Sequence, residues 1–202
     1  MSEQEIFRTI PEQVAARLRH EVLTGKLKPG DPLREIEVSE RFGVSRGPIR
    51  EALRQLTQQG ILVLEPNKGV RVAPNPDSAV RPLVVELRQT IETFVLDSIF
   101  DELTEQDVLQ MESILSDIKV ACEMDDASAL VEHDLRFHRA IIQGHSDKDL
   151  LALWEPIMMR MLMHYARLSN LMDSYLEHKR ILDAIRAGNK DEALKALRAN
   201  IQ

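Results

Sequence analysis

Hydrophobic residues in the first 75 positions follow a helical spacing three times and then a strand spacing twice. Apolar side chains first recur every three or four residues, as they do on one face of a helix. Two short apolar runs follow, and the five residues between them include a proline and a glycine, which favour a turn. The pattern therefore predicts three helices and a β-hairpin. The apolar stretches lie at 14–23, 36–42, 49–56, 61–64 and 70–72.

After position 80 the helical spacing continues to the last residue. The alternation typical of a strand does not occur there, so we expect an antiparallel bundle of helices. Gly144 and Gly188 are expected helix ends, and Thr104 with Asp107 has the pattern of a capping box. The expected helices cover 83–100, 104–124, 127–143, 148–169, 173–187 and 191–202.

A proline-rich segment at 73–77 separates the two patterns, and proline interrupts both helices and sheets. We therefore predict a mainly α protein with two domains. Residues 1–75 are expected to form a winged helix-turn-helix, and residues 80–202 an all-α domain.

The net charge of −7 argues against a nucleic-acid binder until its distribution is considered. Residues 1–76 carry 12 Lys and Arg against 10 Asp and Glu, whereas the remainder carries 14 against 23. The slightly basic first part can therefore meet phosphate, and the acidic second part is expected to have another partner. A single cysteine, with neither a signal-peptide core nor an apolar run of membrane length, indicates a cytoplasmic protein with no membrane partner.

The third expected helix has the features of a helix that reads DNA. Gly43 permits a tight turn before it, and Ser45 is expected to cap it and to bind a phosphate. Arg46 and Arg50 lie four residues apart and share a face, and arginine suits both guanine and phosphate. Gly47 allows a close approach to the major groove.

The hairpin adds a basic wing to this helix. Lys68 lies at its tip and Arg71 behind it, so the wing could reach the minor groove or the phosphate backbone. The alternative is a structural helix pair with solvated arginines. The order of elements and the placement of the arginines together favour DNA binding.

Of the six histidines, one belongs to a pattern that suits a metal. Asp134 and His138 are four residues apart, which on a helix places a carboxylate and an imidazole on one face. Zinc, nickel, manganese and iron accept such ligands. Two ligands are too few, and His164 and His178 are candidates for others. A hydrogen-bonded Asp–His pair without metal is the alternative that this spacing leaves open.

Several segments resemble the GntR family of bacterial regulators, above all GVSRGPIREAL at 43–53, with support from LRE at 33–35, VSE at 38–40, GIL at 60–62 and KGVRV at 68–72. The resemblance implies a symmetric dimer that binds double-stranded operator DNA. The operator-contacting positions carry over to Arg46, Gly47, Arg50, Lys68 and Gly69, with Arg34 as a backbone contact. The family most often has threonine where this chain has Gly47, which implies a shifted operator preference.

The second part resembles the FCD domain of the FadR-like branch of that family, on ELRQTIE (86–92), DLRFH (134–138), EHKRILDAI (177–185) and GNKDEA (188–193). Many FCD domains hold a divalent metal with one Asp and three His, and three of these carry over to Asp134, His138 and His178. Zinc and nickel are the expected ions. The fourth ligand falls on Asn200, whose amide oxygen is a weaker ligand than imidazole. This departure implies weaker binding, an added water or loss of the metal.

The same resemblance implies an effector, a small carboxylic acid in the bundle near the metal. Arg88 lies on the first helix of the bundle and could form two hydrogen bonds with a carboxylate. The alternative is a surface ion pair with Glu92, four residues further on. Arg160 and Asn170 are weaker candidates for the same cavity.

We therefore expect a ligand-responsive regulator that binds operator DNA as a homodimer, without an organic cofactor and without enzymatic activity. Segment 74–76 would convey an effector-induced change to the DNA-binding domain. One alternative is a helical domain that only dimerises. A metal-dependent enzyme is another, but the sequence has no phosphate-binding loop, nucleophile elbow or HExxH motif to support it.

Overall fold

The computed structural model describes residues 9–23, 25–75, 77–162 and 170–202, apart from the side chains at 128, 160 and 162. Contacts between Cα atoms divide the chain into two compact units, Met1–Asn75 and Pro76–Gln202. The division falls within the proline-rich segment that the sequence predicts as a linker. Pro76 itself lies outside the described residues.

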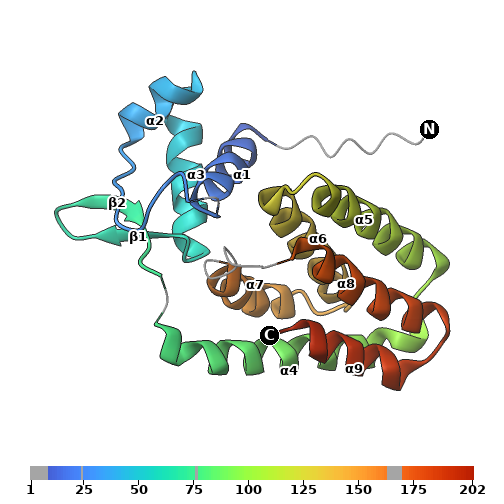
Figure 1. Cartoon of the computed structure of the whole chain (residues 1–202). Coiled ribbons are helices and arrows are strands. Elements are labelled where there is room, and N and C mark those ends of the chain that lie inside the picture. Colours follow the sequence, from blue (N-terminus) through green and yellow to red (C-terminus); the bar gives the residue numbers. More distant parts are fainter. Residues whose placement is uncertain (1–8, 24, 76, 163–169) are drawn as a thin grey trace. The chain divides into compact units, whose positions relative to one another are not determined.

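The described residues of the first unit form three helices and a hairpin, in the order that the sequence predicts (Figure 1). The strands pair antiparallel, with Leu62 opposite Val72 and Glu65 opposite Gly69. The winged helix-turn-helix is thus confirmed. Its elements are α1 (Ile10–Leu23), α2 (Glu35–Phe42), α3 (Arg46–Gln58), β1 (Leu62–Glu65) and β2 (Gly69–Val72).

The turn between α2 and α3 depends on one glycine. Gly43 ends α2 with a φ of 66°, in the left-handed region that glycine adopts without a steric penalty. Ser45 follows in an extended conformation at the N-cap of α3, but its hydroxyl makes no capping hydrogen bond with the described backbone of that helix. The expected side-chain cap is therefore wrong, although the helix begins where the sequence predicts.

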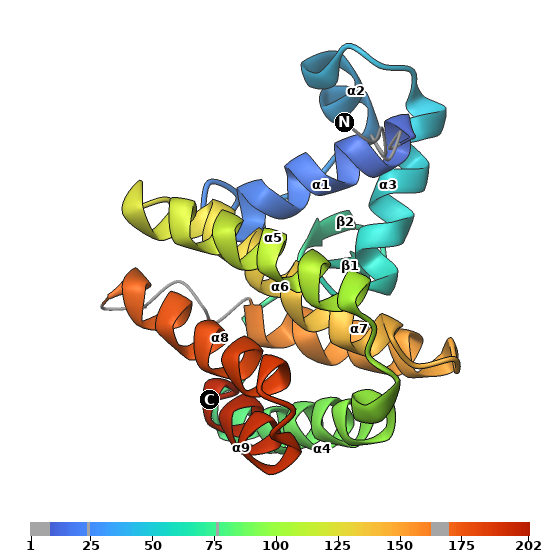
Figure 2. The ribbon, with the colours of Figure 1, turned by 90° about the vertical axis from the view of Figure 1, so that its right-hand side faces the viewer.

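Every regular element among the described residues of the second unit is a helix (Figure 2). Helix α5 packs against α6 and α8, and α4 packs against α6, α7 and α9. The predicted helical bundle is confirmed. Its elements are η1 (Ser78–Val80), α4 (Arg81–Ile99), η2 (Phe100–Glu102), α5 (Glu105–Glu123), α6 (Ala127–Gln143), α7 (Asp149–Leu162), α8 (Leu171–Arg186) and α9 (Lys190–Asn200).

Local features at the helix ends of this unit agree with the sequence pattern. Thr104 Oγ1 accepts a hydrogen bond from the Asp107 N–H at 3.2 Å, and Asp107 Oδ2 accepts one from the Thr104 N–H at 2.8 Å, which confirms the capping box. At Gly144, which follows α6, a Cβ would lie 2.6 Å from Ile99 Cδ1, so a larger residue there would have to displace the end of the Ile99 side chain. Among the described residues, no helix is both long and apolar enough to cross a membrane.

Candidate functional site

The first turn of α3 carries the two arginines that the sequence assigns to DNA reading. Arg50 is exposed and forms a two-pronged ion pair with Glu35 at the start of α2, with Nε–Oε1 at 3.0 Å and Nη2–Oε2 at 2.9 Å. The hydrogen bond from Arg50 lowers the pKa of the Glu35 carboxyl. Glu35 thus orients the guanidinium of Arg50 through two hydrogen bonds. Sequence reasoning missed this role of Glu35, because the two residues meet only through the turn between the helices.

Gly47 lies beside Arg46 in open space. A Cβ at Gly47 would meet no atom of the described residues within 4 Å, and its φ is not positive. The fold therefore does not require glycine there, and a larger side chain would fit. Because Gly47 has no side chain, a partner that approaches this turn from outside meets the backbone there.

The wing presents Lys68 at the turn between the strands. Its Nζ lies 3.2 Å from Glu65 Oε2, and Gly69 follows with a φ of 77°. Arg71 instead donates to the Gly30 carbonyl oxygen at 2.7 Å, so it braces the base of the wing. Arg34, the expected backbone contact, is exposed and pairs with Glu37 at 2.8 Å.

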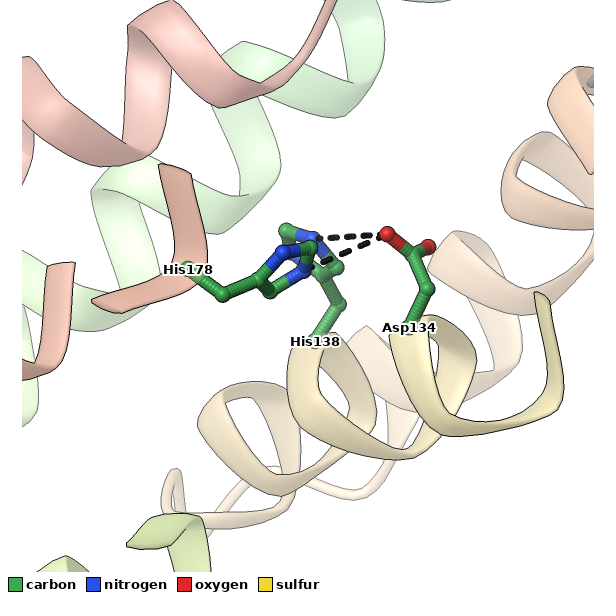
Figure 3. Close-up of side chains that lie close together, drawn as sticks. All are labelled: Asp134, His138 and His178. Carbon is green, nitrogen blue, oxygen red and sulfur yellow. Dashed lines mark ion pairs between the residues drawn. The ribbon is translucent and has the colours of Figure 1, made fainter. Parts of the chain in front are cut away.

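In the second unit, Asp134, His138 and His178 converge in the interior (Figure 3). Asp134 and His138 come from α6, and His178 comes from α8. Asp134 Oδ1 lies 3.2 Å from His178 Nε2 and 3.9 Å from His138 Nε2. All three residues are at most 1% exposed. The structure thus brings the three expected ligands together in a dry site.

The opposite nitrogen of each imidazole has a fixed partner. His138 Nδ1 lies 2.5 Å from Glu92 Oε2, and His178 Nδ1 lies 2.7 Å from the Ser174 carbonyl oxygen. Both partners accept hydrogen bonds, which assigns the proton to Nδ1 in each ring. The Nε2 atoms then point lone pairs toward Asp134, which is the arrangement found around metal-ligating histidines.

Glu92 on α4 joins this cluster to two other helices. Its carboxylate accepts hydrogen bonds from Arg88 Nε at 2.6 Å and from Trp154 Nε1 at 2.7 Å, besides the one from His138. Burial opposes its charge, but Arg88 and His138 outweigh that cost and lower the pKa of Glu92 to about 2. The sequence left open a surface ion pair between Arg88 and Glu92. The ion pair is present, but it is buried and not on the surface, because Arg88 is 2% exposed.

The same surroundings set the charges of the expected ligands. Burial raises the pKa of Asp134, but the neighbouring His178, His138 and Arg88 side chains outweigh it and hold this pKa below its usual range. Burial and the charge of Arg88 lower the pKa of His138, although Glu92 opposes them. The described geometry thus favours an ionised Asp134 beside a neutral His138, as metal binding requires.

The remaining candidates have other surroundings. Asn200, the last residue of α9, is half-buried and its Nδ2 lies 3.4 Å from Glu177 Oε2. Asn170 is exposed and caps α8, because its Oδ1 accepts a hydrogen bond from the Met172 N–H at 3.2 Å. The side chain of Arg160 and the whole of His164 lie outside the described residues.

Comparisons with known proteins agree with both halves of this arrangement. Residues 10–72 match the family described as bacterial regulatory proteins, gntR family, and residues 83–202 match the FCD domain. This chain belongs to the GntR family and carries an FCD domain. Family membership makes it a ligand-responsive transcriptional regulator that binds DNA, and not an enzyme.

Individual relatives are transcriptional repressors. The gluconate operon transcriptional repressor of Bacillus licheniformis is 29% identical over 198 residues, which cover 93% of this chain and 80% of the relative. The repressor RspR of Escherichia coli is 33% identical over 134 residues, which cover 66% of this chain and 58% of RspR. The solved structure of E. coli McbR/YncC shares the fold, with a TM-score of 0.79, 23% identity and coverage of 97% and 95% of the two chains.

Proposed function

We propose that Asp134, His138 and His178 hold one divalent metal ion. The observation that carries this proposal is the convergence of two imidazole Nε2 atoms on one carboxylate oxygen in a buried site. With the Nδ1 hydrogens engaged elsewhere, the three facing atoms all present lone pairs. Lone pairs gathered in a dry interior repel one another unless a cation lies between them. Zinc and nickel suit this mixture of nitrogen and oxygen donors.

The count of buried charges supports both a cation and an anionic effector. The described part of the second unit buries one positive group, Arg88, and two negative groups, Glu92 and Asp134. With neutral imidazoles the interior carries a net charge of about −1, and a divalent ion would change it to about +1. One carboxylate would then balance the interior.

Arg88 is the residue that we assign to that carboxylate. It lies in the same interior, and its charge acts on both Asp134 and His138. An effector carboxylate there would meet a guanidinium held by Glu92 in a medium where charge pairs are strong. The name of the B. licheniformis relative refers to gluconate, which is a sugar carboxylate. A small hydroxy acid is therefore the effector class that we favour.

We further propose that the chain acts as a homodimer on operator DNA. Two copies would present two α3 helices to half-sites about one helical turn apart, with Arg46, Arg50 and the wing in contact with DNA. The effector would favour one of two arrangements of the DNA-binding domains, and so alter operator affinity.

Titration of the metal-free protein tests the metal site. After dialysis against a chelator, calorimetry with Zn²⁺ and Ni²⁺ should show one ion bound per chain. His138→Ala and His178→Ala should abolish this binding. His133→Ala removes a surface histidine from the same helix and should leave it intact. Asn200→His should tighten binding, because an imidazole would then stand at the position where the FCD pattern has its fourth ligand.

Two outcomes would contradict the proposal. A native chain that takes up neither ion, yet keeps full effector binding, has no metal centre. If no small carboxylate raises the melting temperature of the native chain, the helical domain does not bind the proposed effector, because a ligand specific for the folded state must stabilise it. The second outcome would favour a domain that only dimerises.

A further inference from the structure

The first unit buries one charged side chain among its described residues. This residue is Glu21, in the last turn of α1, and it is 7% exposed. A carboxylate leaves water only at a large cost in free energy unless cations face it. Glu21 therefore needs positive partners, and one of them belongs to the helix-turn-helix.

The two carboxylate oxygens of Glu21 face cations on two other segments. Oε2 lies 2.8 Å from Nη2 of Arg41, in the last turn of α2, and Oε1 lies 3.2 Å from Nζ of Lys26, in the loop after α1. The Lys26 side chain is 69% exposed and that of Arg41 is 41% exposed, so water screens the contact with Arg41 less. The carboxylate of Glu21 thus ties the end of α2 to α1.

A second contact joins the same two helices. The guanidinium carbons of Arg17 and Arg41 lie 5.0 Å and 4.8 Å from the centroid of the Phe42 ring. A guanidinium over an aromatic ring is attracted to it. Arg17 and Glu21 are four residues apart on α1, so both contacts to the end of α2 come from one face of that helix.

Helix α2 depends on such polar contacts, because Val38 is the one residue that it buries. At its start, Glu35 forms the two hydrogen bonds with Arg50 on α3. At its end, Arg41 pairs with Glu21. A short helix packed through one side chain can tilt about that side chain unless its ends are fixed. A tilt of α2 would carry Glu35 away from Arg50.

We propose that Glu21 is a positioning residue for operator binding, which acts through Arg41 on α2 and through α2 on Arg50. While the end of α2 is fixed, Glu35 stays where it orients the Arg50 guanidinium. Without the Glu21–Arg41 ion pair, Arg50 samples more rotamers, and ordering it on a base costs more entropy. This inference rests on the proposed operator contact of Arg50, which Arg50→Ala in the otherwise native chain tests separately.

The charge of Glu21 by itself would have the opposite effect on DNA binding. DNA is a polyanion, so removal of a negative charge from the DNA-binding domain should strengthen binding to every sequence. Loss of the Glu21–Arg41 ion pair should instead weaken binding to the operator. The sign of the change therefore separates a positioning role from a role of charge alone.

The affinities of Glu21→Gln for operator and for random DNA test the proposal. Operator binding should weaken by about fivefold or more, which is the lower end of what one base-reading arginine contributes. Binding to random DNA should be unchanged or tighter. Glu40→Gln removes an exposed carboxylate from α2 and is the matched control, which should weaken neither affinity. Urea unfolding at the assay temperature gives the folded fraction by which each affinity is corrected.

The variant Arg41→Gln provides a second test from the other side of the ion pair. It should lower the ratio of operator affinity to random-DNA affinity, and Glu21→Gln added to it should lower that ratio no further. Three results would overturn the proposal: operator binding by Glu21→Gln that is native or tighter, an equal loss on operator and random DNA, or a Glu21→Gln effect that is the same with and without Arg41. If Glu21→Gln does not fold, a native ratio in Arg41→Gln overturns it.

Discussion

Glu92 accepts hydrogen bonds from side chains on three helices and connects these helices in the interior of the second unit. Its partners are Arg88 on its own helix, His138 on α6 and Trp154 on α7. The spacing of Arg88 and Glu92 predicts their pairing, but not that the pair is buried. The contacts with His138 and Trp154 could not be predicted, because they depend on how the helices pack.

Replacement of Glu92 by glutamine should destabilise the protein strongly. The change removes the buried negative charge that pairs with Arg88, and it turns an amide N–H toward one of three donors. Loss of one member of a buried ion pair costs roughly 3–5 kcal/mol of unfolding free energy. Urea unfolding measures the loss, and Glu86→Gln on the exposed side of α4 is the matched control. A cost equal to that of the control would mean that Glu92 does not hold the cluster.

Arg46 and Arg50 should each contribute to operator affinity. Alanine at either position should weaken binding by about 1–3 kcal/mol if the arginine reads a base. Arg54→Ala, on the same helix but one turn further from its start, provides the comparison for a general loss of positive charge. Fluorescence anisotropy on DNA selected by the native protein gives these affinities. Unchanged binding by both Arg46→Ala and Arg50→Ala would show that α3 is not the reading helix.

At the scale of elements, the periodicity of apolar residues was sufficient to predict the three helices, the hairpin and the helical bundle. Its errors arose where side chains act locally. Ser45 occupies the N-cap of α3 without a side-chain hydrogen bond, and the sequence did not predict that Asn170 caps α8. Capping depends on rotamers and on the exact helix start, which hydrophobic spacing does not define.

The wing should behave differently from α3. Lys68 lies at the tip of the hairpin beside Glu65, where it can reach phosphate but carries no geometry for reading a base. Lys68→Ala should therefore weaken binding to all DNA sequences to a similar degree and reduce the salt dependence by about one counterion. Titrations of operator and random DNA at several salt concentrations distinguish the two effects. Loss of affinity for the operator alone would assign a sequence-reading role to the wing.

At the scale of the whole molecule, charge and burial divide the functions between the two units. The first unit contains the basic residues expected to meet DNA, and the second contains a buried cluster with ionised groups that a core does not need. The sequence predicts this division from its charge asymmetry, and the three residues that it proposes as ligands, Asp134, His138 and His178, come together in the structure. It could not reveal that Leu83, Leu87 and Phe94 on α4 are exposed, because the exposure of a side chain follows only from the packing of its neighbours.

Control of DNA binding by a ligand in the second unit is the central claim, and operator affinity tests it most directly. The measurement is the dissociation constant for operator DNA at fixed salt, with and without each small carboxylate that stabilises the protein in a thermal-shift screen. At least one such carboxylate should change this constant by about 5- to 150-fold. Equal affinity with and without every stabilising carboxylate would contradict the account.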